Sequence, residues 1–299
     1  MKTSQPPAHT PGKALSIVAA AYVLALLAAT GTGYLYRGLH PVFMILSADI
    51  AGTLVIYIFG RIFHNASFYD PYWSIAPLFM ALFWLYGFSS WAAVTLRQII
   101  VAVLVFAWGL RLTFNWARRW QGLKDEDWRY RDLRTKSKGW FWLVDLVGIE
   151  LMPTIMVFLG CLSLYPALAA GGNRFNILDI AAIIITAGAI LIEATADEQL
   201  RDFLKKKPVP GEIMAEGLWA YARHPNYLGE VTFWWGLFFF AIASGISYWW
   251  TIIGPVFITA LFTFISVPMM DKRNATRRPG YDEYTKNTPA LIPRFSRTR

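Results

Sequence analysis

Long apolar segments constrain this chain more than any other feature of its sequence. Residues 14–36, 41–60 and 231–268 are almost free of charged side chains, and a helix needs about 20 apolar residues to cross a bilayer core. Only 16% of the 299 residues are charged, whereas soluble domains carry about 25%. Membrane β-barrels show strands of about ten residues with alternating hydrophobicity, and no such alternation occurs here. The sequence therefore predicts an all-α, polytopic membrane protein.

Apolar runs of spanning length predict about eight transmembrane helices in a single integral membrane domain, residues 1–299. We place these helices at residues 14–36, 41–62, 73–90, 93–117, 141–168, 176–199, 227–246 and 249–268. Residues 1–13 are expected to form a flexible N-terminus. Because proline removes a backbone donor and disturbs the helix around it, we expect kinks or helix ends at Pro153, Pro166, Pro255 and Pro268.

Basic residues concentrate in three segments outside the apolar runs, residues 118–139, 201–212 and 271–299, in a chain of formal net charge +9. Cytoplasmic loops carry an excess of Lys and Arg. We therefore expect all three segments and both termini to be cytoplasmic, in what we expect to be a bacterial inner membrane. The lipid bilayer is the expected partner. No nucleic-acid motif accompanies the charges, so nucleic acid is not expected, and the sequence names no protein partner.

Polar side chains also fall within or beside the apolar runs. Arg111, Asn115 and Arg118 recur at helical spacing and share one face. Three acids, Asp70, Asp145 and Glu150, also lie within or beside apolar runs. Structural ion pairs are one explanation, because buried charges need partners. Taken together, these residues predict a polar cavity that opens toward the cytoplasm.

The segment EDWRYRDLR, residues 126–134, interleaves acids, arginines and aromatic residues. Such a mixture indicates a folded patch with ion pairs and aromatic packing rather than a solvated run of charge. Arg129 and Tyr130 are its candidate binding residues.

The stretch GLWAYARHPNYLGE, residues 217–230, places five hydrogen-bonding groups at the start of an apolar run. We expect a helix to begin after Pro225 with Asn226 as its N-cap, and a helix N-terminus suits an anionic group. Glu230 lies four residues later on the same face. A carboxylate that enters an apolar helix is costly and marks a functional site by default. A purely structural helix start is the alternative.

A second cluster, EATADEQLRDF, contains Glu193, Asp197 and Arg201 at intervals of four residues, so they share one helix face. An ion pair between Asp197 and Arg201 is the structural explanation. Glu193 lies deeper in the apolar run and has no obvious local partner. The histidines are scattered and Cys161 is the single cysteine, so no metal site is expected.

Together these motifs resemble the steroid 5-alpha-reductase superfamily, and most closely its uncharacterised bacterial branch, a membrane domain of unknown function. RHPNYLGE, preceded by GLWAYA and followed by the tail RRPGYDEYTKNTPALIP, carries the resemblance. DPYWS, WGLRLTFNWARR, EDWRY and EATADEQLRDF match that branch in the same order, so the resemblance covers residues 65–295. RHPNYLGE alone is less specific, since isoprenylcysteine carboxyl methyltransferases and sterol reductases carry a similar stretch.

The resemblance implies a cytoplasm-facing NADPH pocket in the C-terminal half, residues 118–299, and a substrate side in residues 14–117. It implies that Asn226, Tyr227 and Glu230 hold the nicotinamide–ribose part of the cofactor and that Asp197 and Arg201 contact it. The tail residues that would serve the adenine and phosphate end are Arg273, Arg277, Tyr281 and Tyr284. The other cofactor-binding candidates are Arg111, Asn115, Arg118, Arg129, Tyr130, Glu193, Arg223 and His224.

Two positions depart from the steroid enzymes. Glu193 stands where they have an asparagine, and MMDKRNATRR, residues 269–278, stands where their tail carries histidines. The cofactor contacts at both places are therefore expected to differ from theirs.

The leading hypothesis is an NADPH-dependent oxidoreductase, similar to a steroid 5-alpha-reductase. It would reduce a carbon–carbon double bond, conjugated to a carbonyl, in a lipophilic substrate that enters from the membrane. The cofactor supplies the hydride and the protein positions it, while a buried acid polarises the carbonyl. Asp70, Tyr69 and Tyr72 are the candidates for this acid, and burial would raise the pKa of a carboxyl group there.

Two other functions stay open. A methyltransferase that uses S-adenosylmethionine on a membrane-embedded acceptor is the rival enzyme, although arginine clusters suit the phosphates of NADPH better than a sulfonium cation. A non-enzymatic membrane protein that binds or transports lipids is the third hypothesis. It predicts a polar path through both faces, whereas the polar groups of this chain crowd the cytoplasmic half.

Overall fold

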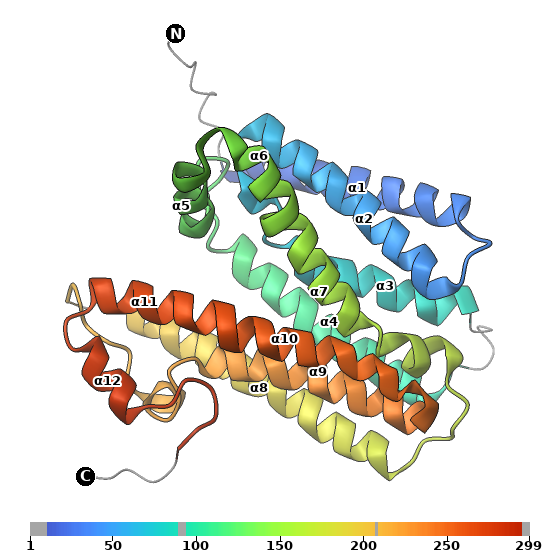
Figure 1. Ribbon diagram of the computed structural model, residues 1–299. Helices are drawn as coiled ribbons and strands as arrows, with labels where there is room; N and C mark the ends of the chain where they lie inside the picture. Colours follow the sequence, from blue (N-terminus) through green and yellow to red (C-terminus); the bar gives the residue numbers. More distant parts are fainter. Residues whose placement is uncertain (1–10, 89–93, 207–208, 295–299) are drawn as a thin grey trace. The chain divides into compact units, whose positions relative to one another are not determined.

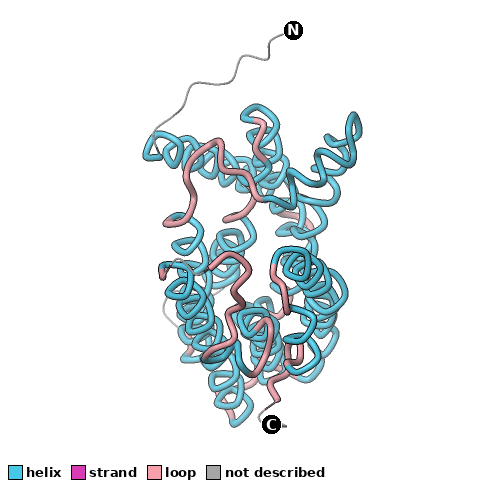
Figure 2. Tube along the Cα trace, turned by 90° about the vertical axis from the view of Figure 1, so that its left-hand side faces the viewer, coloured by secondary structure: helices cyan, strands magenta, loops and turns pink. Residues whose placement is uncertain are grey.

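The computed structural model describes residues 11–88, 94–206 and 209–294, so most of the N-terminus expected to be flexible lies outside the described residues. Within these three ranges every regular element is helical and there is no strand (Figure 2). The predicted all-α class is therefore confirmed.

The chain divides into two compact units. Unit 1 comprises Met1–Gly87 and Val105–Cys161, and unit 2 comprises Phe88–Leu104 and Leu162–Arg299. Residues 118–161 thus pack with the N-terminal helices, whereas the sequence analysis grouped them with the C-terminal half. The functional division at residue 117 remains a prediction.

Unit 1 is built on a pair of long helices, α1 (Pro11–Leu35) and α2 (Pro41–Phe63). Its other elements are η1 (Ala66–Phe68), α3 (Tyr72–Phe88), the last part of α4 (Leu96–Ala117), α5 (Trp128–Ser137), η3 (Lys138–Trp140), α6 (Phe141–Val144), η4 (Asp145–Leu151) and α7 (Met152–Cys161). Small residues on α1, among them Ala14, Ala21 and Ala25, are buried against α2. Small side chains let two helix backbones approach closely where lipid provides no hydrophobic drive.

Unit 2 is built on α8 (Ile177–Lys205), α9 (Pro225–Ser244) and α10 (Ile253–Leu261), which run side by side in Figure 1. Its other elements are the first part of α4, η5 (Pro166–Ala170), η6 (Gly217–Ala220), η7 (Ile246–Ile252), η8 (Phe262–Ser266), α11 (Val267–Arg277) and α12 (Tyr281–Asn287). A capping box of Asn176 and Asp179 starts α8. Asp179 also receives two hydrogen bonds, at 2.6 and 2.8 Å, from the buried Arg97 at the start of α4.

The four prolines predicted to disturb helices all lie beside a departure from α-helical geometry. Pro166 opens the π-helical η5. Pro153 and Pro268 are the second residues after the π-helical segments η4 and η8, and Pro255 is the third residue after the 3-10 segment η7. Because proline lacks an N–H and clashes with the carbonyl of the preceding turn, the hydrogen-bond register changes there. The prediction is confirmed.

Seven helices in the described ranges are long and apolar enough to cross a membrane. They correspond to seven of the eight predicted spans. The eighth, α3, has 17 residues, about 26 Å at the usual rise per residue, which is shorter than a bilayer core of about 30 Å. Large apolar side chains face outward on these helices, such as Ile184 and Leu191 of α8, each 67% exposed. Extended apolar surfaces of this kind are expected where a protein contacts lipid.

Candidate functional site

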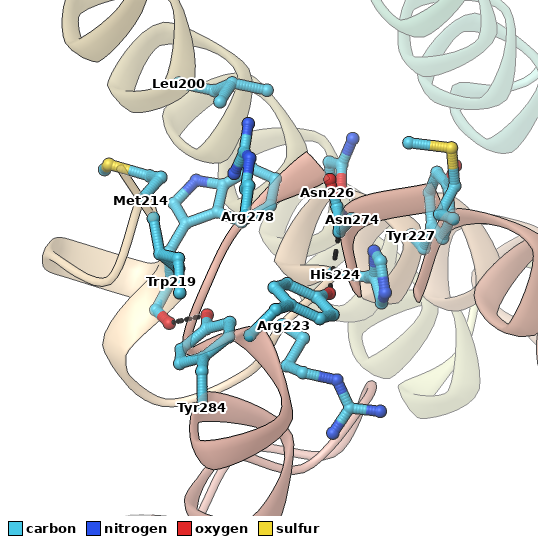
Figure 3. A pocket seen from close by; sticks show the side chains of 13 residues that line it. Leu200, Met214, Trp219, Arg223, His224, Asn226, Tyr227, Asn274, Arg278 and Tyr284 are labelled. Carbon is cyan, nitrogen blue, oxygen red and sulfur yellow. Dashed lines mark hydrogen bonds between the residues drawn. The ribbon is translucent and has the colours of Figure 1, made fainter. Parts of the chain in front are cut away.

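Unit 2 contains a small cavity between the end of α8, the start of α9 and the elements α11 and α12 (Figure 3). Its volume is about 120 Å³, and it is lined by Leu200, Ile213, Met214, Trp219, Arg223, His224, Asn226, Tyr227, Met270, Asn274, Arg278, Tyr281 and Tyr284. Pockets that enclose a whole drug-sized ligand have volumes of about 300–1,000 Å³. This cavity can therefore enclose one end of a dinucleotide but not the whole of it.

Local sequence shapes the wall that carries Arg223 and His224. Gly217 has φ +57°, and a Cβ there would lie 2.5 Å from the side-chain nitrogen of Gln199. Gln199 Oε1 accepts a hydrogen bond from the backbone N–H of Leu218 at 2.9 Å. A side chain at residue 217 would be strained and would displace this contact, so glycine is required for the approach of η6 to α8.

The start of α9 differs from the sequence prediction. Pro225 is the first helical residue and His224 occupies the N-cap position without a side-chain cap, so Asn226 is not the N-cap. Proline favours the first helical position because its missing N–H would be unpaired there anyway. The Asn226 amide instead lies 3.5 Å from Asp197 Oδ1 on α8. Two residues selected from separate motifs are thus brought together.

Asp271 on α11 joins three residues of the cavity wall. Its carboxylate accepts hydrogen bonds from Arg223 Nη2 at 2.7 Å and from the Tyr281 hydroxyl at 2.6 Å, and it lies 2.9 Å from His224 Nε2. These partners are 48, 10 and 47 residues away in sequence. The positive charge of Arg223 is therefore neutralised within the protein, and the wall is held in one arrangement.

The chain beyond α12 closes this arrangement from the other side. The backbone N–H groups of Arg223 and His224 donate to the carbonyls of Pro289 and Ala290 at 2.9 and 3.0 Å, and Arg294 N–H donates to the Tyr221 carbonyl at 3.2 Å. The RHPN segment is thus fixed by backbone hydrogen bonds as well as by Asp271.

Arg278 gives the cavity an uncompensated positive charge. It is half-buried, and its guanidinium has no hydrogen-bond or ion-pair partner among the described residues. Nearby, burial raises the pKa of Tyr284 to about 12, although the guanidinium of Arg223 opposes that change. The neutral Tyr284 hydroxyl donates to the Trp219 carbonyl (Figure 3). The cavity therefore combines one free cation with neutral polar and aromatic groups, a set that suits an anionic group on a planar ligand.

Six of the cofactor candidates in unit 2 do not line this cavity, namely Glu193, Asp197, Arg201, Glu230, Arg273 and Arg277. Glu230 is buried one turn further along α9, where its Oε1 accepts a hydrogen bond from Trp234 Nε1 at 2.8 Å. Arg201 forms an ion pair with Glu198, three residues before it. The candidates that do line the cavity are Arg223, His224, Asn226, Tyr227, Tyr281 and Tyr284.

The candidates for the proton donor lie in unit 1. Asp70 Oδ1 accepts a hydrogen bond from the Tyr130 hydroxyl at 2.8 Å. Burial raises the pKa of Asp70 to about 6, against the opposing effects of this hydrogen bond and of Arg129. The Tyr69 hydroxyl lies 2.8 Å from Thr154 Oγ1, and burial raises the pKa of Tyr69 well above its ordinary value.

Tyr72 is paired with an acid that the sequence analysis missed. Its hydroxyl donates to Asp49 Oδ1 at 2.9 Å, and both side chains are buried in unit 1. Asp49 interrupts the apolar run of α2, which is the signal that could have identified it. A buried tyrosine–carboxyl pair is well suited to polarise a carbonyl oxygen, because the pair can share one proton and donate another.

The remaining candidates of unit 1 form parts of a folded polar patch. Arg129 Nε donates to Asp127 Oδ1 at 2.8 Å, and its guanidinium lies 5.6 Å from the centre of the Tyr130 ring. The residues Glu126 and Arg134 also form an ion pair, so the predicted folding of residues 126–134 is confirmed. Arg111 and Asn115 lie on α4, where Arg111 is half-buried and Asn115 is buried; Arg118 directly follows the helix and is exposed.

The sequence analysis missed several residues of the cavity in unit 2. Arg278 and Asn274 lie one and three residues from Arg277, which had been selected. Arg277 is exposed, whereas Asn274 and Arg278 line the cavity, because the three side chains leave the chain in different directions. Trp219 belongs to GLWAYA but was not selected, Met214 lies in none of the selected motifs, and Asp271 falls in MMDKRNATRR.

Helical composition, seven spans of membrane length and a polar cavity beside RHPNYLGE define a polytopic membrane protein of the all-α class. The chain belongs to the family described as "Protein of unknown function (DUF1295)", which matches residues 56–288. It is similar to the uncharacterized protein C594.04c of Schizosaccharomyces pombe, with 27% identity over 275 residues, 82% of this chain and 80% of the relative. No solved structure matches the chain.

Proposed function

We propose that this protein is an NADPH-dependent reductase that acts on a carbon–carbon double bond conjugated to a carbonyl in a lipophilic substrate. The observation that carries the proposal is Arg278, a half-buried cation on the wall of the unit 2 cavity with no acidic partner among the described residues. NADPH offers phosphate groups to such a cation, whereas S-adenosylmethionine brings a positive sulfonium.

The other groups on the cavity wall fit one end of a dinucleotide. Asn226 and Asn274 offer amide donors and acceptors, and Trp219 and Tyr284 offer aromatic surface. The Asp271 carboxylate already neutralises Arg223, so Arg278 is the arginine of this wall that is available for a phosphate. NADPH supplies a hydride when it is bound; the protein binds and orients it.

The acid that polarises the substrate carbonyl is assigned to Tyr72, supported by Asp49. Their hydrogen bond lies in a buried part of unit 1, and in such surroundings a donor interacts strongly with developing negative charge. Asp70 and Tyr69 stay the other candidates, and they are hydrogen-bonded to Tyr130 and Thr154 as Tyr72 is to Asp49.

Cofactor binding by the detergent-purified protein tests the proposal. We would measure thermal stabilisation with NADPH, NADH and S-adenosylmethionine. A ligand that binds only the folded protein, at 100 times its Kd, adds about 2.7 kcal/mol to the free energy of unfolding. We expect stabilisation by NADPH, and its loss in Arg278→Gln.

Arg277→Gln is the matched control, since this neighbouring arginine is exposed and lies outside the cavity. It removes the same charge from the same segment, and NADPH stabilisation should persist. Equal loss of NADPH stabilisation in both variants would show that Arg278 acts only through its positive charge and not by binding a phosphate group. Stabilisation by S-adenosylmethionine alone would replace the proposal with methyl transfer, and no stabilisation by any of the three ligands would favour a non-enzymatic protein.

A further inference from the structure

Glu150 is a buried carboxyl group without a partner. It lies in the π-helical segment η4 of unit 1, its side chain is 0% exposed, and neither carboxyl oxygen has a hydrogen-bond partner among the described residues. Buried polar groups almost always have such partners, and an exception requires an explanation. The η4 segment belongs to a helix long and apolar enough to cross a membrane, so the same carboxyl is also costly with respect to lipid.

Four other buried carboxyl groups of the described chain have a partner. Asp179 pairs with Arg97, Glu126 with Arg134, Asp49 with Tyr72 and Glu230 with Trp234. In these four cases a donor accompanies the buried acid, whereas neither oxygen of Glu150 has one.

The π-helical turn also relates Glu150 to a second acid. Residues five apart are hydrogen-bonded in a π-helix, so the turn stacks Asp145 and Glu150, which an α-helix would place on different faces. Asp145 is buried as well, with its Oδ2 3.7 Å from Arg61 Nη1, and the Arg61 side chain is 38% exposed. Asp145 thus pairs with a partly exposed arginine and also interacts electrostatically with Glu150.

Within the described part of the chain, no base acts on the Glu150 carboxyl. The titratable groups that interact with its carboxyl are Asp145 on the same turn, Asp70 after η1, Tyr22 on α1, Tyr57 on α2, and Tyr69. All of them are acids. An unpaired carboxylate in such surroundings costs far more than the neutral acid, and Glu150 is fully buried.

We propose that Glu150 is a proton-storing site, held as the uncharged carboxylic acid in the resting protein, and that it exchanges its proton with the surface through Asp145. The exchange balances as follows: Glu150 gives its proton to the enolate that forms when the substrate accepts the hydride, and becomes a carboxylate. Asp145 then protonates Glu150 again with a proton taken from the accessible side beside Arg61.

The use of this proton rests on the proposed function. Reduction of a conjugated double bond adds a hydride to one carbon and a proton to the other, so each turnover consumes one proton. A buried acid that can be recharged meets that need without opening the site to water. The storage site itself does not depend on the identity of the reaction.

Infrared spectroscopy of the purified full-length protein tests the charge of Glu150 directly, because the carbonyl stretch of a carboxylic acid is separate from the bands of a carboxylate. In the difference between wild type and Glu150→Gln at pH 7, we expect the loss of one acid band. Glutamine is neutral and of the same shape, so the melting temperature should change little. If Glu150→Gln does not fold, Glu150→Asp serves instead and should shift the acid band.

Glu126→Gln is the matched control, a buried glutamate of the same unit that is paired with Arg134. It should remove carboxylate bands and no acid band. Loss of carboxylate bands in Glu150→Gln, or absence of any acid band from that difference, would overturn the proposal.

The route through Asp145 is tested by transfer into heavy water. The Glu150 acid band shifts when its proton is replaced by deuterium, and we expect that replacement to be several-fold slower in Asp145→Asn than in the wild type. An unchanged rate would remove Asp145 from the route. This readout needs no turnover, so failure of the reductase proposal, seen as absence of NADPH binding, is distinguishable from failure at Glu150.

Discussion

Asp70 shows how burial sets the charge of a single side chain. Its pKa in the folded protein is about 6, raised from 3.8 mainly by burial. The folded state therefore holds this proton more tightly than the unfolded state, and the stabilisation is complete below pH 4 and is lost as the pH rises through 6. At about 1.4 kcal/mol per pKa unit, the loss amounts to about 3 kcal/mol.

Thermal unfolding in detergent between pH 4 and pH 7 measures this effect. We expect Asp70→Asn to lose less stability than the wild type across that interval, because the amide stays neutral while it still accepts a hydrogen bond from Tyr130. The difference between the two proteins isolates Asp70 from other titrating groups. Parallel pH profiles would show that the pKa of Asp70 is the same in the folded and unfolded states, and would contradict the prediction.

For single residues, the sequence could identify polar side chains but not the partners that they contact. Helical spacing favoured a pair between Asp197 and Arg201, whereas Arg201 is paired with Glu198. Spacing defines a shared face but does not decide between two acids within reach of one arginine. The partners of Asp271 are up to 48 residues away, and only the fold brings them together. Asp49 was overlooked although an acid within an otherwise apolar run is itself a signal of function.

The pair of helices α8 and α9 illustrates the element scale, because glycine and other small residues form their contact. A Cβ at Gly229 would lie 2.6 Å from Glu193 Cβ, and a Cβ at Gly236 would lie 2.1 Å from Thr186 Oγ1. We expect Gly236→Ala and Gly229→Ala to lower the free energy of unfolding by about 1–3 kcal/mol each, measured by thermal unfolding.

Gly188 provides the control for this prediction. It lies on α8, and an added Cβ there meets no atom within 4 Å. Gly188→Ala should be neutral or should stabilise the protein by up to about 1 kcal/mol, because alanine favours a helix. Similar destabilisation in all three variants would show that backbone flexibility, rather than close packing, explains the glycines.

The sequence predicted the positions of the helices better than it predicted the geometry of the site. Apolar runs and prolines predicted the helices and their irregularities, since both depend on local composition. The short helix α5 was foreseen only as a folded patch. The π-helical register of η4, which stacks Asp145 and Glu150, depends on packing around Pro153 and has no sequence signature of its own.

Contacts between distant segments organise the chain at the scale of the whole molecule. Thr154 on α7 lies 2.9 Å from Thr53 Oγ1 and 2.8 Å from the Tyr69 hydroxyl, contacts that span 101 and 85 residues. They place α7 in unit 1, although sequence order suggested the C-terminal half. Reading along the chain predicts which segments are helices, but pairing across 100 residues depends on side-chain complementarity that no local pattern reveals.

Whether α3 crosses the membrane decides the topology of the whole molecule. If this 17-residue helix crosses the membrane, Arg37 and Arg174 lie outside and Lys124 and Lys286 lie in the cytoplasm, as the basic loops predict. A span slightly shorter than the core is tolerated at modest cost, because the bilayer thins around it. If α3 does not cross, every segment after it changes sides, so that Lys124 and Lys286 lie outside and Arg174 inside.

The single cysteine makes the distinction measurable, since Cys161→Ala leaves a chain without thiols. We would introduce one cysteine at a time at Arg37, Lys124, Arg174 and Lys286, all exposed in the structure, and treat intact cells with a membrane-impermeant maleimide. We expect labelling of Arg37→Cys and Arg174→Cys, and labelling of Lys124→Cys and Lys286→Cys only after permeabilisation. Labelling of Lys124→Cys and Lys286→Cys in intact cells, with Arg174→Cys protected, would show that α3 stays on one side. The cavity beside RHPNYLGE would then face away from the cytoplasm and its NADPH, so this topology would also contradict the proposed reductase.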